Sequence, residues 1–536
     1  MKAYDAVAAT IREVGVDTVF GLMGDANMLY LSSFMRDGGH YIPVVHEGSA
    51  VSMADGYARI GQRVGVASVT HGPGLTNTLT ALVEACRMHS PVVLITGGTP
   101  PVQHHIQEFD IQGMARLAGA HYYEVRRAEE LTHDISYATS LAATTRMPVV
   151  LNIPLGLMEA EVERQAGRPA VVARAAGPDI ADGAVKRAID LIGRSERPLI
   201  VAGRGAVLSH AREELLALAR QINAPVATSA LAKDFFRGHE FNLGIMGGAA
   251  NSLALEAAEN TDCVIAFGAG LNQFTNHHGI LSGKILIQFD TDPARIGKHT
   301  IPDVGVVADV KASARMLVEQ LPRRDERGLC TDVLRDRVAE WSAAGEFLDP
   351  QSTSTQDMRV ATQLIEAVLP DDKVVITDGG RMIFAPWEFL SVRAGADFNH
   401  STGFGAVGLA LATAVGAAVV DPNRVTVAAV GDGGGIMGML EVSTAVREQL
   451  PLVVLVLNDS AYGMECYKLD RSGVDPKYAL LAWPEFADLA TAMGATGVTV
   501  RSEADVAAVA EHIENRRFPL VIDVKVDTDI PIQVLS

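Results

Sequence analysis

A chain of 536 residues is too long for one hydrophobic core and predicts roughly three domains of ordinary size. Because 48% of the residues are apolar and 20% are charged, the composition excludes a disordered or fibrous chain. The net charge of −19 argues against nucleic acid as a partner, and four cysteines without metal or disulfide spacing, with no signal peptide, predict a cytoplasmic protein.

The first part of the chain alternates predicted strands and helices. Apolar runs typical of buried strands occur at 18–20, 41–45, 64–70 and 91–96, and helical patterns occur at 4–14, 50–59 and 76–87. Several of these strands end in polar or glycine-containing turns, among them the turns that begin at His46 and His71. This alternation is typical of a doubly wound parallel sheet.

Two segments rich in charge, at 159–183 and 322–345, are interpreted as connections between domains. Further strands are predicted at 198–202, 263–267, 285–289 and 374–377. We therefore predict three doubly wound α/β domains with mostly parallel sheets, at residues 1–165, 180–325 and 355–536.

One uncharged run, at 403–420, is close to the length of a membrane span. It is rich in Gly and Ala and contains few large apolar residues, which favours a buried helix packed closely against its neighbours. The sequence therefore predicts no association with a membrane.

The stretch 425–465 carries the most informative pattern. Apolar, β-branched runs at 425–430 and 452–457 predict two parallel strands joined by a helix around 441–449. The first strand is followed by Gly-Asp-Gly-Gly-Gly around Asp432, and the second by Asn-Asp-Ser around Asp459. Open α/β sheets bind ligands at the carboxyl ends of their strands. Glycines let backbone N–H groups approach a phosphate, and Mg²⁺ is the simplest way to hold two aspartates beside that anion. A plain strand-to-helix turn is the alternative for Gly-Asp-Gly alone, and the second polar strand end favours a ligand site.

These two strand ends resemble the thiamin diphosphate motif of the acetolactate synthase and pyruvate decarboxylase superfamily. In that motif Gly-Asp-Gly is followed by Asn-Asn, and the chain departs from it once, at Asp459. The segments HEGSAVSMADGYAR and VTHGPGLTN and the run 403–408 also match, so the resemblance covers nearly the whole chain. It implies a pyrimidine-binding domain, a central domain and a diphosphate-binding domain, in this order.

The resemblance implies that Asp432, Asp459 and the backbone carbonyl of Ala461 hold Mg²⁺. It also implies that Val407 is an apolar wedge that bends the cofactor. The other implied cofactor-binding residues are Gly72, Asn77, Gly379, Gly380, Arg381, Met382, Gly405, Gly431, Gly433, Gly434, Tyr462, Gly463 and Met464.

Glu47 stands where the superfamily has the carboxyl group that hydrogen-bonds the aminopyrimidine ring and promotes loss of the thiazolium proton. A first-turn glutamate that complements a helix dipole is the structural alternative. Because this carboxyl group and the metal site come from different subunits in the superfamily, the resemblance implies at least a homodimer, and we expect a homotetramer.

The candidate active-site side chains support two outcomes after a 2-oxo acid is decarboxylated to an enamine. Asp25, His104-His105 and Glu465 match residue types of pyruvate decarboxylase-like enzymes, whose proton donors favour aldehyde release. His71 matches an active-site histidine of benzoylformate decarboxylase-like enzymes. Gln107 instead resembles acetolactate synthase, which adds the enamine to a second carbonyl. Ordinary surface histidines remain the alternative for His104-His105.

Two departures from acetolactate synthase argue against FAD. The synthase's Pro-Lys-Asp is Pro-Leu-Gly around Leu155, and its flavin-associated Gly-x-Arg-Phe-Asp becomes Gly-Ala-Gly-Leu-Asn, which ends at Asn272. We therefore predict a thiamin diphosphate- and Mg²⁺-dependent, acetolactate synthase-like lyase or transferase acting on a 2-oxo acid or related carbonyl. A simple 2-oxo acid decarboxylase is the alternative, followed by a flavin-dependent oxidase and a non-catalytic cofactor-binding homologue.

Overall fold

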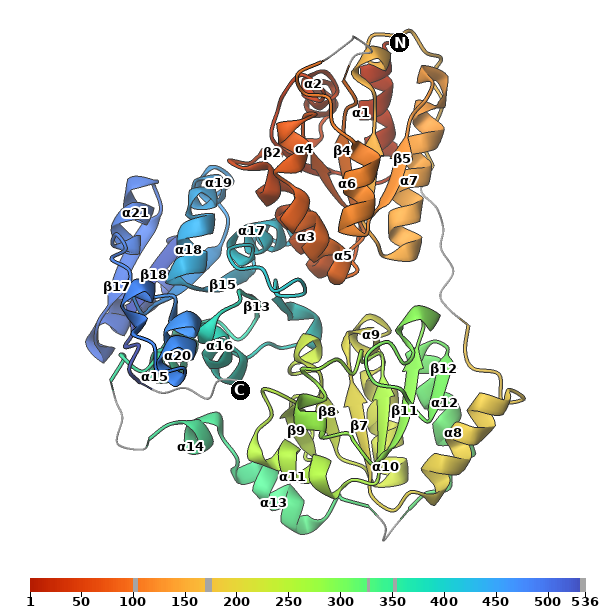
Figure 1. The fold of residues 1–536 in the computed structure, drawn as a ribbon, viewed down its shortest axis with the longest axis vertical. Coiled ribbons are helices and arrows are strands. Elements are labelled where there is room, and N and C mark those ends of the chain that lie inside the picture. Colours follow the sequence, from red (N-terminus) through yellow and green to blue (C-terminus); the bar gives the residue numbers. More distant parts are fainter. Residues whose placement is uncertain (100–104, 169–175, 325–327, 350–353, 531–536) are drawn as a thin grey trace. The chain divides into compact units, whose positions relative to one another are not determined.

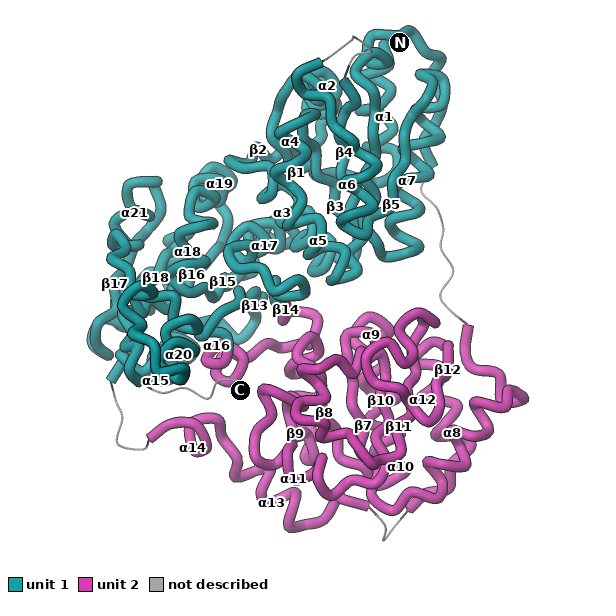
Figure 2. The backbone as a smooth tube through the Cα atoms, in the orientation of Figure 1, with its two compact units in different colours: residues 1–172, 354–383, 400–530 teal, residues 173–353, 384–399, 531–536 magenta. Residues whose placement is uncertain are grey.

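The structure, a computed structural model, describes residues 1–99, 105–168, 176–324, 328–349 and 354–530. The chain folds into two compact units, drawn in two colours in Figure 2. Unit 1 contains residues 1–172, 354–383 and 400–530, and unit 2 contains residues 173–353, 384–399 and 531–536.

Two parallel sheets, each of six strands, belong to unit 1, except that residues 398 and 399 of the edge strand β14 are counted in unit 2 (Figure 1). The first has the order β2-β1-β3-β4-β6-β5, and the other has the order β14-β13-β15-β16-β18-β17. The strands of the first sheet are β1 (Thr18–Gly21), β2 (His40–Pro43), β3 (Gly65–Ser68), β4 (Val92–Thr96), β5 (His121–Glu124) and β6 (Val149–Asn152). Those of the other are β13 (Lys373–Thr377), β14 (Phe398–His400), β15 (Val425–Gly431), β16 (Leu452–Asn458), β17 (Thr496–Val500) and β18 (Leu520–Lys525).

Helices pack against both sheets of unit 1. In the N-terminal part they are α1 (Ala3–Glu13), α2 (Met28–Arg36), α3 (Glu47–Gly61), α4 (Pro73–Thr76), α5 (Leu79–Arg87), α6 (Ile111–Ala118) and α7 (Leu131–Thr145). In the C-terminal part they are α15 (Met358–Val368), α17 (Ala410–Val420), α18 (Asp432–Gly438), α19 (Val442–Arg447), α20 (Gly463–Arg471), α21 (Phe486–Ala492) and α22 (Val506–Glu514).

Unit 2 contains one parallel sheet of six strands with the order β12-β11-β10-β7-β8-β9. Its strands are β7 (Pro198–Ala202), β8 (Val226–Thr228), β9 (Asn242–Ile245), β10 (Cys263–Phe267), β11 (Ile285–Asp290) and β12 (Val304–Val307). Its helices are α8 (Gly183–Arg194), α9 (Arg204–Leu208), α10 (Arg212–Ile222), α11 (Ser252–Asn260), α12 (Val310–Gln320), α13 (Asp332–Glu340), α14 (Ala343–Phe347) and α16 (Phe384–Phe389).

The three parallel sheets confirm the predicted fold class. The element predictions were incomplete, because strands β5, β6, β8, β9, β12, β14, β17 and β18 were not identified. The predicted helix at 441–449 begins earlier in the structure, since α18 starts at Asp432 directly after β15. The charged stretch 322–345 contains α13 and most of α14.

The uncharged run at 403–420 ends in α17, which packs against α3 within unit 1. The close contact depends on glycine. A Cβ atom on Gly56 would overlap the carbonyl oxygen of Thr413, and one on Gly416 would overlap that of Met53. The run is therefore rich in small residues because two helix backbones meet there. Among the described residues, no helix is long and apolar enough to cross a membrane.

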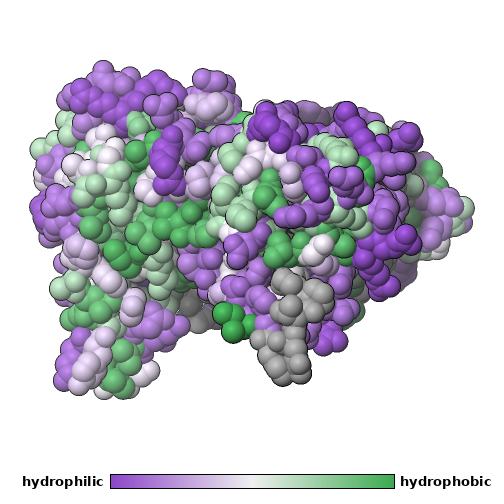
Figure 3. All heavy atoms as spheres, turned by 90° about the horizontal axis from the view of Figure 1, so that it is seen from above, coloured by the Kyte–Doolittle hydropathy of each residue, from purple (hydrophilic) through white to green (hydrophobic). Residues whose placement is uncertain are grey.

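Hydrophilic residues cover much of the face drawn in Figure 3, with smaller groups of apolar residues between them. This distribution agrees with the charged residues, 20% of the sequence, lying mainly outside the cores.

Candidate functional site

A cavity of about 270 Å³ lies at the carboxyl ends of β13, β15 and β16. It brings together most of the residues that the sequence assigned to the cofactor and metal in the C-terminal domain. The predicted residues that line it are Gly379, Gly380, Arg381, Met382, Val407, Gly431, Asp432, Gly433, Gly434, Asp459, Ala461, Tyr462, Gly463, Met464 and Glu465. The strand pairing explains the convergence, because β15 and β16 run parallel and Gly431 is in register with Leu457.

Asp432 is the first residue of α18 and is buried. Its Oδ1 accepts a hydrogen bond from the N–H of Gly433 at 2.7 Å, and its Oδ2 accepts one from the N–H of Ala461 at 3.1 Å. Burial, together with the nearby charge of Asp459, raises the pKa of Asp432 to about 7. A cation bound at this carboxyl group would favour its charged form.

Asp459 forms a buried ion pair with Arg381. Its Oδ2 lies 3.0 Å from Nη1 of Arg381, and the two side chains are 7% and 6% exposed. Arg381 also donates through Nη2 to the carbonyl oxygen of Ile530 at 2.5 Å. The guanidinium group therefore compensates the negative charge that distinguishes Asp459 from the Asn of the motif, although burial still raises the pKa of Asp459.

Asp378 is a buried carboxyl group that the sequence analysis did not assign to the site. It directly follows β13, and its Oδ2 accepts a hydrogen bond from the N–H of Gly408 at 2.7 Å. Its Oδ1 has no hydrogen-bond partner among the described residues, and burial raises its pKa to about 7. A Cβ on Gly434 would overlap Oδ2, so Asp378 packs between the loop that ends at Gly408 and the start of α18. Its position at a strand end was the signal that could have found it.

Val407 lies in the loop between Gly403 and Gly408 and is 41% exposed. Its methyl groups approach the positions where Cβ atoms of Gly379 and Gly434 would lie, at 3.5 and 3.0 Å. Larger residues at these two glycines would narrow the cavity beside Val407. Gly405, in the same loop, is exposed and has a φ of +79°.

The cavity residues suit a diphosphate held through a hard cation. Asp432 and Asp459 supply carboxylate oxygens, and the glycines leave room beside the backbone. Within the described ranges, no three His, Cys, Asp or Glu side chains converge in a metal-binding group. A cation at this cavity would therefore also need backbone, water or phosphate oxygens.

Glu47 is the first residue of α3 and is partly buried. Its Oε2 accepts a hydrogen bond from Nδ2 of Asn77 at 3.0 Å, so the two predicted residues lie together. Neither lines the cavity around Asp432.

Glu441 supports the turn before Glu47. Its buried Oε1 accepts hydrogen bonds from the N–H groups of Val45 and His46 at 3.1 and 3.2 Å. The two hydrogen bonds join residues that lie 396 and 395 positions apart in the sequence, so no local pattern indicated them. The glutamate fixes the backbone from which α3 begins.

The remaining predicted catalytic residues are only partly brought together. His71 is buried, its Nε2 lies 2.9 Å from Oε1 of Gln107, and its ring lies 5.7 Å from that of His105. Gly72 has a φ of +61° and leaves space for the backbone of Gln107. Asp25 is exposed in the turn before α2 and does not line the cavity around Asp432. His104 lies outside the described residues.

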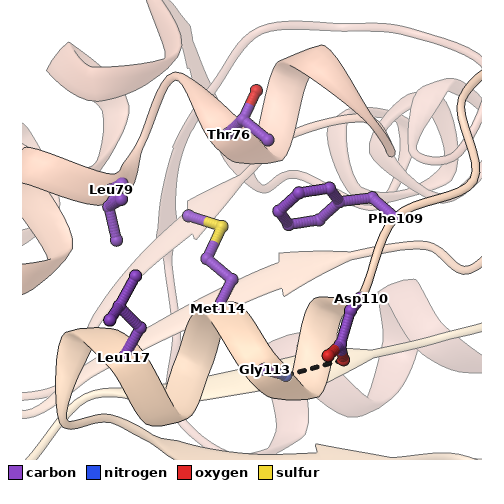
Figure 4. A pocket seen from close by; sticks show the side chains of 7 residues that line it. All are labelled: Thr76, Leu79, Phe109, Asp110, Gly113, Met114 and Leu117. Atoms are coloured by element: carbon purple, nitrogen blue, oxygen red, sulfur yellow. Dashed lines mark hydrogen bonds between the residues drawn. The ribbon is translucent and has the colours of Figure 1, made fainter.

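A smaller apolar pocket of about 260 Å³ lies between α5 and α6 (Figure 4). The side chains of Leu79, Phe109, Met114 and Leu117 line it. Asp110 at its edge caps α6 by accepting a hydrogen bond from the N–H of Gly113 at 2.7 Å.

Three family models match the chain in sequence order. The thiamine pyrophosphate enzyme N-terminal TPP binding domain matches residues 1–114, the central domain matches 185–317, and the C-terminal TPP binding domain matches 378–524. The last match contains the residues around the cavity at β13, β15 and β16.

Relatives match over most of their length. Sulfoacetaldehyde acetyltransferase of Alcaligenes xylosoxydans xylosoxydans is 30% identical, and the match covers 94% of this chain and 89% of that protein. Acetolactate synthase large subunit of Parasynechococcus marenigrum is 29% identical, over 97% of this chain and 87% of that protein. An X-ray structure of a Mycobacterium smegmatis protein assigned to the thiamin diphosphate-dependent enzymes has a TM-score of 0.82 at 24% identity, and covers 98% of this chain and 99% of that chain. The similarity to this X-ray structure shows a shared fold and nothing further.

A double-mutant cycle tests the ion pair between Arg381 and Asp459. We expect Arg381→Met and Asp459→Asn each to lower the free energy of unfolding by about 3 kcal/mol, because each leaves one buried charge unpaired. The free energy of unfolding of the double variant should fall by about 2 kcal/mol less than the sum of the two single losses. Urea unfolding without divalent cations measures these values. The exposed pair Arg501 and Glu485, 3.3 Å apart, is the control and should couple by less than about 1 kcal/mol. Strict additivity at the buried pair would contradict the assignment.

Asp378→Asn tests the buried carboxyl group. The folded-state pKa of about 7 lies above the ordinary 3.8, so between these values the folded protein retains a proton that the unfolded chain loses. Stability contributed by this group therefore decreases as the pH rises through this range. We expect the stability of the variant relative to wild type to increase by about 2–3 kcal/mol from about pH 5 to about pH 8.

Urea unfolding at the two pH values measures this difference. Asp488→Asn, at an exposed position in α21, is the matched control and should show no such trend. A difference between Asp378→Asn and wild type that is constant with pH would show that Asp378 does not titrate in this range.

Proposed function

Because the chain belongs to the thiamine pyrophosphate enzyme family, we propose that it uses thiamin diphosphate and Mg²⁺ to break or form a carbon–carbon bond beside a carbonyl group. The first substrate is a 2-oxo acid. The observation that carries the proposal is the cavity at the ends of β13, β15 and β16, where Asp432, Asp459 and a set of glycines converge. Bound thiamin diphosphate supplies the electron sink that lets a 2-oxo acid lose CO₂.

The residues of the chain would hold the cofactor at both of its ends. Asp432, Asp459 and the carbonyl of Ala461 would hold the cation, and the glycines of the cavity would admit the diphosphate. Glu47, held by Asn77, would hydrogen-bond the pyrimidine ring. The turn fixed by Glu441 keeps this carboxyl group at the start of α3.

We propose a homodimer as the minimal active form and a homotetramer as the assembled protein. The cavity around Asp432 is lined only by C-terminal residues, and Glu47 is not among them. Around the cavity, Val407, Met437 and Tyr462 are 41%, 61% and 42% exposed in the single chain. Exposed apolar side chains at the border of a site support burial by a second subunit.

Carboligation is the proposed outcome of the reaction. His71 and Gln107 lie in hydrogen-bond contact in the N-terminal domain, and Gln107 resembles the residue of acetolactate synthase. Relatives named acetolactate synthase and sulfoacetaldehyde acetyltransferase also support transfer of the remaining group to a second substrate. The changes at Leu155 and Asn272 support activity without FAD.

Simple decarboxylation is the second candidate, and one observation favours it. Glu465 lines the cavity around Asp432, where a carboxyl group can deliver a proton. Asp25, the other acidic residue expected in such a relay, is exposed in a turn. The cytoplasm is the proposed location for either reaction.

The carbon balance of the reaction tests the proposed function. Purified protein with thiamin diphosphate and Mg²⁺ is given pyruvate and longer 2-oxo acids, and CO₂, aldehyde and 2-hydroxyketone are quantified. We expect CO₂ together with a hydroxyketone, because Gln107 favours addition to a second carbonyl. Aldehyde equal to CO₂ would establish the decarboxylase instead.

Glu47→Gln distinguishes the catalytic step from cofactor binding in the same assay. We expect turnover to fall by at least about 100-fold because the pyrimidine ring loses its carboxyl partner. Cofactor binding should persist, since the residues around Asp432 are unchanged. Normal turnover in this variant, or no CO₂ from any 2-oxo acid with the wild type, would contradict the proposed function.

A further inference from the structure

The N-terminal domain contains a cavity of about 330 Å³ at the carboxyl ends of β3, β4, β5 and β6. His71 and Gln107, the hydrogen-bonded pair from the candidate active site, line one part of it. Tyr122, Glu124 and Asn152, at the ends of β5 and β6, line another part. We call it the β5–β6 pocket. It extends from candidate catalytic side chains to residues that no motif in the sequence indicated.

A chain of hydrogen bonds orders the part of the pocket beside β5 and β6. Asn152 donates through Nδ2 to the Tyr122 hydroxyl at 3.1 Å, and this hydroxyl donates to Oε2 of Glu124 at 2.8 Å. Burial raises the pKa of Tyr122 to about 12, so the hydroxyl keeps its proton. Because Asn152 takes part in this chain through its Nδ2, its Oδ1 is left outside the chain.

Two buried acceptors of this pocket have no donor among the described residues. Oδ1 of Asn152 is unpartnered although the residue is only 5% exposed, and it lies against Gly98, which also lines the pocket. His71 is 3% exposed, and its Nδ1 is unpartnered as well. The Oε1 atom of Gln107 can only accept, so Nε2 of His71 donates to it, and Nδ1 is an acceptor whenever the ring carries a single proton. Leaving buried acceptors unpaired is costly, so a ligand with donors would stabilise this arrangement.

The charges beside β5 and at the start of α6 disfavour an anionic group in that part of the pocket. Glu108 and Glu124 line it, together with Asp110, which caps α6. The part of its lining that the structure describes includes no Lys or Arg. A carboxylate, phosphate or sulfonate placed there would be repelled, whereas hydroxyl groups can donate to both carboxylate and amide oxygens.

We infer that the β5–β6 pocket binds the non-reacting part of the substrate, and that this part is a hydroxylated carbon chain. The inference rests on the proposed function, because it assumes that His71 and Gln107 lie beside the reacting carbon. The hydroxyl groups donate hydrogen bonds to the side chains of Asn152 and Glu124. The described lining has no Lys or Arg from which they would accept one. The pocket thus selects hydroxylated 2-oxo acids over those with an apolar or acidic end.

A trio of six-carbon acids tests this selection in the cofactor-loaded protein. The acids are 2-oxo-3-deoxygluconate, 2-oxohexanoate and 2-oxoadipate, which end in hydroxylated, apolar and carboxylate groups. CO₂ release gives kcat/KM for each, whatever the later fate of the carbon. We expect the hydroxylated acid to be preferred by at least about tenfold over either of the others.

Adjacent tyrosines of β5 give a matched pair of variants. Tyr122→Phe should lower kcat/KM for the hydroxylated acid by about tenfold more than for 2-oxohexanoate, which has no hydroxyl group to bind, and Glu124→Gln should do the same. Tyr123→Phe is the control and should change neither value, because the Tyr123 hydroxyl donates to Asp134 instead. Equal losses for both acids, or preference for 2-oxoadipate, would overturn the inference.

A binding measurement separates this inference from the proposed function. If no acid yields CO₂, the proposed function fails, and the pocket is then tested by saturation-transfer NMR with erythritol and succinate. Binding of erythritol that is lost in Asn152→Leu and in Tyr122→Phe, with no binding of succinate, would support the pocket alone. No binding of erythritol to the wild type would overturn it.

Discussion

The parallel pairing of β15 with β16 is the constraint on which the candidate site depends. Each strand is a continuous apolar run buried in the sheet, and both end at the same edge. The residues after them, Asp432 and Asp459, therefore meet at one cavity although 26 residues separate them in the sequence. Asp378 reaches the same edge from β13, which pairs with β15 on its other side.

This convergence places three carboxyl groups in buried positions, since Asp378 and Asp432 and the side chain of Asp459 are all less than 10% exposed. Burial raises the pKa of Asp378 and Asp432 to about 7, and it also raises that of Asp459. Within the cavity, Arg381 supplies the compensating cation, and it pairs with Asp459 rather than with Asp432. The site therefore retains an excess of acidic oxygens, which is the arrangement expected of a site completed by a divalent cation.

The sequence predicted those features that follow from local pattern. The alternation of strands and helices identified the fold class, and the strand runs at 425–430 and 452–457 with the polar residues after them placed a ligand site at their carboxyl ends. Most other residues of the lining were named only through the resemblance to the thiamin diphosphate motif. Contacts between residues that are distant in the sequence leave no local pattern from which they could be predicted. The pairing of Arg381 with Asp459 and the support of the turn before Glu47 by Glu441 join residues that are distant in sequence. Short strands such as β5 and β6 were also missed, and the β5–β6 pocket was missed with them.

Thiamin diphosphate binding measured by isothermal titration calorimetry tests the central claim, that the cavity at β13, β15 and β16 holds a diphosphate through a divalent cation. The account predicts saturable binding in the presence of Mg²⁺. It predicts a loss of at least about tenfold in affinity in EDTA, and a similar loss in Asp432→Ala with Mg²⁺ present. Undiminished affinity in both conditions would contradict the account.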